Sequence, residues 1–125
     1  MTEYVQNFRG LQVWQKAHKL LLSVVEIIDK LPDNPKGRIL GQQLLRSASS
    51  IGANIAEGFG RRQGKEMEYF FFIAKGSSLE TENWLLVLRD IGFLDNKNFL
   101  KLEGLCQEVT KMLGAFVHKS QSRRK

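Results

Sequence analysis

The stretch LRSASSIGANIAEGFGRR, residues 45–62, places two different faces side by side on one predicted helix. Solvated helix faces usually carry Lys, Glu and other strong helix formers rather than Ser and Asn. The pattern therefore predicts a helix whose polar stripe contacts a neighbouring helix or a partner. At the 3.6-residue helical period, the apolar face holds Leu44, Ala48, Ile51, Ile55 and Phe59, and the polar stripe beside it holds Gln43, Ser47, Ser50, Asn54, Glu57 and Arg61.

Apolar residues recur at helical spacing on both sides of this stretch and predict four helices in all. Pro32 ends the first helix, Gly92 ends the third, and Asp95 or Asn96 caps the fourth. The predicted helices cover about residues 9–30, 36–59, 65–91 and 96–118, and residues 119–125 form a frayed basic tail.

The fold class follows from these helices and from the short connections between them. No segment alternates apolar and polar residues between turn signals, so no sheet is expected. Four helices of similar length with short loops predict an all-α, antiparallel up-down-up-down four-helix bundle. A chain of 125 residues with 42% apolar content suits a single domain over residues 1–125.

Residues of the first three predicted helices carry a family resemblance. They are Leu11, Val13, Trp14, Ala17, Gln43, Arg46, the run SIGANIAEG from Ser50 to Gly58, Arg61, Ile73, Ala74, Gly76, Ser77 and Glu80. In these residues the chain resembles the four-helix-bundle proteins encoded in intervening sequences of bacterial 23S ribosomal RNA genes, over roughly residues 8–95. The resemblance implies a four-helix bundle that assembles into a closed ring, with a pentamer as the candidate form. It implies no reaction, and bundles related to this family also serve as accessory subunits of retroelement reverse transcriptases.

The third predicted helix has more apolar surface than one core needs. Phe72, Leu79 and Leu86 recur every seven residues, away from the predicted inward face. Large exposed apolar patches usually mark interaction sites, and self-association is the simplest way to cover one. The pattern predicts a homo-oligomer with these three residues at the interface. The alternative is that the extra side chains only thicken a single core.

Positive charge favours an anionic partner, because the net charge is +6 and the sequence pI is about 9.7. Two groups of cations are the candidate contacts, and we expect them at opposite ends of the subunit. Such contacts to phosphates bind nucleic acid in a salt-sensitive, largely sequence-independent way, and a ring would multiply them. The alternative is solvated loop and tail charge without a partner. The groups are Arg61, Arg62 and Lys65 near the second connection, and Lys119, Arg123, Arg124 and Lys125 in the tail.

The polar stripe also predicts a structural network. Glu80 lies between Ile73 and Val87 on the third helix, where a buried charge needs a partner. We expect a network centred on Arg46 with either Glu80 or Glu57, between helices or between subunits. The alternative is that the same residues form a ligand site. The predicted members are Arg46, Ser50, Asn54, Glu57 and Glu80.

The sequence predicts no enzyme, no cofactor and no metal site. A ferritin-like site requires Glu-x-x-His pairs, and no Glu stands three residues before His18 or His118. Two isolated histidines and the single Cys106 supply neither a triad nor a zinc framework. The glycines from Gly58 to Gly64 lack the GK[ST] ending of a phosphate loop and follow a helix.

One cysteine, no secretory leader and no membrane-length apolar run indicate a soluble cytoplasmic protein. We therefore expect a non-enzymatic, oligomeric bundle that binds nucleic acid, with RNA favoured by the family resemblance. The alternative function is a protein–protein scaffold or accessory subunit that engages an acidic or RNA-handling partner protein.

Overall fold

The computed structural model describes residues 7–61 and 64–123. Four long helices make up most of this part of the chain, and a short 3₁₀ turn, η1 (Phe8–Gly10), precedes them. No strand occurs within the described ranges, so the predicted all-α fold with four helices is confirmed. The helices are α1 (Gln12–Asp29), α2 (Pro35–Arg61), α3 (Gly64–Asp90) and α4 (Asn96–Arg123).

The first helix begins later than predicted, at residue 12 rather than near residue 9. Leu11 has an extended backbone (φ −78°, ψ 126°), which separates η1 from α1. The side chain of Asn7 accepts a hydrogen bond from the backbone N of Arg9 at 2.9 Å and caps η1. Gln15 Nε2 then donates to the carbonyl of Arg9 at 2.8 Å, so side chains on both sides hold this break in place.

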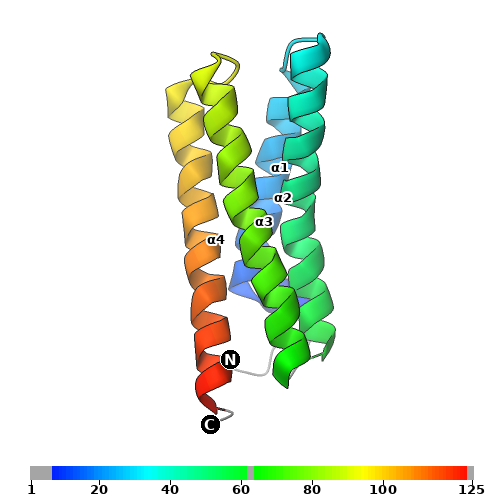
Figure 1. Ribbon diagram of the computed structural model, residues 1–125, viewed down its shortest axis with the longest axis vertical. Helices are drawn as coiled ribbons and strands as arrows, with labels where there is room; N and C mark the ends of the chain where they lie inside the picture. The colour runs from blue at the N-terminus through cyan, green and yellow to red at the C-terminus, as the bar shows by residue number, and fades with distance from the viewer. Residues whose placement is uncertain (1–6, 62–63, 124–125) are drawn as a thin grey trace.

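Turn residues account for the connection between α1 and α2. Pro35 is the first residue of α2, where its missing N–H removes no helical hydrogen bond. Asn34 precedes it, and its Oδ1 accepts a hydrogen bond from Gly37 N at 2.9 Å. These residues form the sharp turn seen at one end of the molecule (Figure 1).

The connection between α3 and α4 is a glycine-terminated helix followed by a capped one. Gly92 has a φ of +84°, and Phe93 N donates to Leu88 O at 2.8 Å, which completes a Schellman motif. Asp95 Oδ1 then accepts a hydrogen bond from Asn98 N at 2.7 Å and caps α4. The predicted end of the third helix at Gly92 and the predicted cap of the fourth helix by Asp95 are therefore confirmed.

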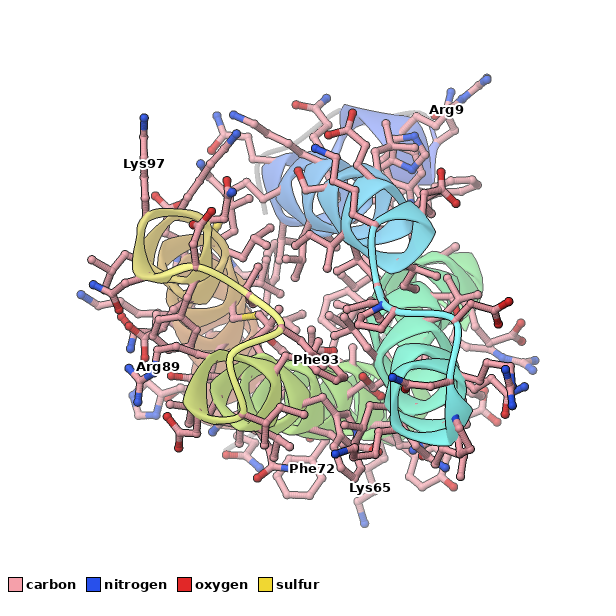
Figure 2. All side chains as sticks on the ribbon, turned by 90° about the horizontal axis from the view of Figure 1, so that it is seen from above. Arg9, Lys65, Phe72, Arg89, Phe93 and Lys97 are labelled. Carbon is pink, nitrogen blue, oxygen red and sulfur yellow. The ribbon has the colours of Figure 1, made fainter. Side chains whose placement is uncertain are left out.

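The helices pack side by side around one apolar core, with α3 between α2 and α4, and with α1 against α2 and α4 (Figure 1; Figure 2). Large side chains from all four helices fill this core, among them Leu20, Phe71 and Phe99. The inward face predicted for the second helix is confirmed, because its five apolar residues are buried. They are Leu44, Ala48, Ile51, Ile55 and Phe59.

The final helix continues beyond its predicted end, through residues 119–123. Ser120 Oγ donates a hydrogen bond to Glu68 Oε2 at 2.5 Å, and the ring of Phe116 lies edge-on to the buried ring of Phe71. These contacts with α3 hold the last turns of α4. The prediction of a frayed tail was wrong for residues 119–123, and residues 124–125 lie outside the described part of the chain.

The described members of the two predicted groups of cations, Arg61 and Lys65 on one side and Lys119 and Arg123 on the other, lie at the same end of the molecule (Figure 1). The expected placement of the two groups at opposite ends was therefore wrong for these residues. The end of α2, the start of α3 and the end of α4 meet at this end, together with the start of α1 (Figure 1). The hydrogen bond between Ser120 and Glu68 joins the end of α4 directly to the start of α3. The chain reverses direction between α3 and α4, which brings the C-terminal helix back to the α2–α3 end.

Candidate functional site

Hydroxyl groups connect α2 and α3 across their buried contact. Ser47 Oγ lies 2.9 Å from Thr81 Oγ1, and both residues are fully buried. One turn away, Ser50 Oγ lies 2.9 Å from Ser77 Oγ. Asn54 Nδ2 donates to the carbonyl of Ser50 at 2.8 Å and approaches its hydroxyl at 2.9 Å. The short side chains of the polar stripe therefore face the neighbouring helix, as the sequence predicts.

A separate set of hydroxyl contacts joins α3 to α4. Ser78 Oγ donates to the carbonyl of Cys106 at 3.0 Å, and Thr110 Oγ1 lies 2.9 Å from Ser78 Oγ. Each of these hydroxyls has a hydrogen-bonding partner, so these contacts satisfy buried polar groups. Their geometry supplies register between helices and includes no activated nucleophile.

Apart from the polar stripe of α2, the site prediction missed four residues that take part in these hydroxyl contacts. A signal was present for the three on α3, because small hydroxyl residues occupy inward positions of the predicted third helix. The sequence did not determine on which neighbouring helix each hydroxyl group would find its hydrogen-bonding partner. The missed residues are Ser77, Ser78, Thr81 and Thr110.

An ion pair joins the outer edges of α2 and α3. Arg46 Nη2 contacts Glu80 Oε2, and Arg46 also donates to Gln43 Oε1 at 2.9 Å. Trp84 Nε1 donates to Glu80 Oε2 at 3.0 Å. The Arg46 and Glu80 side chains are 57% and 35% exposed, so the pair lies at the surface rather than in the core. Exposed pairs of this kind contribute at most about 1 kcal/mol to stability.

Glu57, another predicted member of the network, pairs elsewhere. Its Oε2 accepts a hydrogen bond from Arg61 Nη2 at 2.8 Å, one turn along α2. Of the two pairings considered from the sequence, the structure forms Arg46 with Glu80. The predicted network therefore divides into this surface ion pair, the hydroxyl contact at Ser50 and Asn54, and a separate pair at the end of α2.

Cations from three helices occupy the end where α2 meets α3, which we call the basic end. Arg61 closes α2, Lys65 begins α3, and Lys119 and Arg123 lie in the last turns of α4. All four residues are exposed. Three further residues that the sequence predicts as nucleic-acid contacts lie outside the described ranges. They are Arg62, Arg124 and Lys125.

The cations of the basic end differ in what they contact. Arg61 forms an ion pair with Glu57, and the guanidinium carbon of Arg61 lies 5.5 Å from the centre of the Phe70 ring. Lys65, Lys119 and Arg123 form no ion pair with another residue of the described ranges. These three side chains are therefore the ones available to an external anion.

The outer face of α3 exposes apolar and aromatic side chains. Tyr69, Phe72 and Leu79 are 61%, 65% and 49% exposed. Phe72 and Lys65 project from the same outer side of α3, away from the core (Figure 2). Leu86, the third residue of the predicted interface, is half-buried and packs against the core of its own subunit. The exposed apolar surface of α3 therefore lies between residues 69 and 79.

Cys106 is buried among the helices, where its thiol stays protonated at neutral pH. Burial, with smaller effects of the Glu82 and Glu103 charges, raises the pKa of this thiol to about 12. Across residues 7–61 and 64–123, no group of three or more His, Cys, Asp or Glu side chains is placed to hold a metal ion. No helix in these ranges combines the length and apolar character needed to cross a membrane.

Comparisons with known proteins identify relatives of this four-helix chain. A crystal structure at 1.70 Å resolution of a protein of unknown function from the S23 ribosomal protein family of Bacteroides thetaiotaomicron superposes with a TM-score of 0.78. The two sequences are 26% identical, and the match covers 84% of this chain and 97% of that one. No curated protein sequence matches the chain. The model of the 23S rRNA-intervening sequence protein family matches residues 9–115, and the chain therefore belongs to this family.

Proposed function

We propose that this chain is a non-enzymatic RNA-binding protein that acts as a homo-oligomer. The observation that carries the proposal is the gathering of Lys65, Lys119 and Arg123 at one end of the subunit. The Ser120–Glu68 hydrogen bond holds the end of α4 against the start of α3. Cations from two helices thus lie at one end of the subunit instead of at two.

A polyanion is the partner that such a surface suits best. Lys and Arg contact phosphates without reading bases, and each contact releases counterions, so binding weakens as salt rises. RNA is favoured over DNA by the family to which the chain belongs, which is named for intervening sequences of 23S rRNA. That support concerns where these proteins are encoded, and the charged surface supplies the physical argument.

Self-association is the second part of the proposal. Phe72 and Leu79 expose apolar surface on α3 that a second copy would cover. A closed ring, with five subunits as its candidate size, would repeat the basic end around one rim. Multivalent contact then raises the affinity for a long polyanion without any new type of interaction.

Two triple variants with the same change in net charge test the RNA contact. We expect the combined variant Lys65→Ala, Lys119→Ala and Arg123→Ala to bind a single-stranded RNA with a weaker salt dependence. The negative slope of log affinity against log salt concentration should become smaller in magnitude by about 2. Lys36, Lys97 and Lys101 form no ion pair within the described ranges and lie toward the opposite end. Their triple alanine variant is the matched control and should leave most of the slope intact.

Fluorescence anisotropy with a labelled oligonucleotide at several salt concentrations measures both slopes. Equal losses in the two triple variants would indicate a general charge effect and contradict contact at the basic end. Wild-type affinity that is absent or independent of salt would remove the RNA proposal.

A scaffold or accessory role toward another protein is the second candidate. The exposed Phe72 and Leu79 side chains favour it, because they could pack against a partner protein as well as against a second copy. An acidic or RNA-handling partner would suit the neighbouring cations. Salt-independent RNA binding together with a monomeric chain in solution would favour this role over the first.

A further inference from the structure

Tyr69 lies on the outer face of α3, one helical turn after Lys65. Its side chain is 61% exposed, and its hydroxyl makes no hydrogen bond with another residue of the described ranges. Lys65 is exposed and unpaired there as well. Residues four apart on a helix have Cβ atoms about 5–6 Å apart. A flat aromatic ring and a free cation therefore stand next to each other at the basic end.

The Tyr69 ring contacts the aromatic ring of the next residue. The ring lies edge to face with Phe70, with 5.3 Å between ring centres and 75° between ring planes. Phe70 is half-buried, and the guanidinium of Arg61 lies over its ring. Arg61 is itself held by Glu57. A chain of contacts thus runs from the end of α2 to Tyr69, and it orients an aromatic surface toward the solvent.

We infer that Tyr69 stacks on an unpaired base and that the basic end therefore prefers single-stranded RNA to duplex RNA. This inference rests on the proposed RNA binding and specifies its substrate class. Proteins that bind single strands combine backbone-tracking cations with aromatic rings on which bases stack. In a duplex the base faces are covered by their neighbours, so an exposed ring gains nothing there. The pairing of Lys65 with Tyr69 supplies both parts of a single-strand site.

The test compares an unstructured single-stranded RNA with the duplex of the same sequence. In anisotropy titrations, Tyr69→Ala should weaken single-strand binding by about five-fold or more and change duplex binding by less than about two-fold. Tyr69→Phe keeps the ring and should bind both RNAs as the wild type does. Leu100→Ala is the control, because Leu100 is also exposed, at 54%, but lies in the first turns of α4.

The outcomes separate this inference from the proposal on which it rests. If Tyr69→Ala has no effect, or weakens both RNAs equally, while the Lys65, Lys119 and Arg123 triple variant loses RNA affinity, stacking is overturned and RNA binding stands. If the wild type binds neither RNA, both proposals fall. Light scattering on Tyr69→Ala completes the test, since a changed subunit number with no loss of single-strand preference assigns Tyr69 to the interface and overturns stacking.

Discussion

Gly58 and Phe71 lie so close together that a Cβ atom at residue 58 would come within 2.7 Å of Phe71 Cδ1. Phe71 is 1% exposed and meets Phe116 edge-on, with 5.4 Å between ring centres. The ring is therefore packed on both sides and has little room to turn away. Within the run SIGANIAEG, the last residue is glycine because α2 and α3 touch at this point.

Gly58→Ala should lower the free energy of unfolding by about 1 kcal/mol. Overpacking a core costs about 1–3 kcal/mol, and the better helix propensity of alanine offsets about 1 kcal/mol of that. Gly104→Ala in α4 is the control, since a Cβ atom there meets open space, and it should stabilise by about 0.5–1 kcal/mol. Urea unfolding measures both. Equal stabilities of the two variants would show that the α2–α3 contact relaxes freely.

Ser47→Ala and Thr81→Val should each lower the free energy of unfolding by about 1 kcal/mol. Each removes one side of a buried contact between hydroxyls 2.9 Å apart. The double variant should lose less than the sum, because both changes remove the same shared contact. Ser49→Ala is the control, as Ser49 is exposed and its side chain bonds, among the described residues, only to the carbonyl of Arg46. Additive losses would mean that the two hydroxyls are not coupled.

Phe72→Ser with Leu79→Ser should shift the protein toward single subunits in solution. Both changes remove exposed apolar surface from α3 and leave the core intact. Gel filtration with light scattering measures the subunit number, and circular dichroism checks that the fold survives. Leu100→Ser removes an equally exposed leucine from α4 and should leave assembly unchanged. An unaltered subunit number in the double variant would place the interface elsewhere.

Stability should fall with rising pH between about 9 and 12, in part because of Cys106. Burial raises the pKa of this thiol from its ordinary value of 9.0 to about 12, so the folded protein keeps a proton that the unfolded chain has lost. This contribution is complete below pH 9 and is lost as the pH approaches 12, by up to about 1.4 kcal/mol per pH unit. Unfolding of Cys106→Ala by urea across this range should show a shallower decline. Parallel pH curves for the two proteins would contradict a buried, neutral thiol.

Local patterns determined the elements of this fold. The spacing of Leu44, Ile51 and Ile55 was enough to place one buried face, because periodicity and burial are properties of a single helix. Pro32 and Gly92 marked helix ends through backbone constraints that need no neighbour. The run SIGANIAEG, which carries part of the family resemblance, could be recognised for the same reason, since it is continuous in the sequence.

Pairings between helices were decided by the tertiary structure. Arg46 pairs with Glu80 rather than with Glu57, since Glu80 lies beside it across the α2–α3 contact and Glu57 is taken by Arg61. The hydroxyl partners of Ser47 and Ser78 likewise depend on the relative rotation of three helices. Residues that pair between different helices stand at no fixed spacing in the sequence, so the sequence alone does not identify the pairs.

The sequence by itself determined four helices, their inward faces and an excess of positive charge. Only the tertiary structure decided that the last turns of α4 stay helical and that the cations share one end. Residues 119–123 look like a tail because they are polar, yet Ser120 reaches Glu68 on α3 and holds them in place. Helix formation follows local spacing along the chain, whereas the placement of Lys65, Lys119 and Arg123 at one end follows from the reversal of chain direction between α3 and α4 (Figure 1).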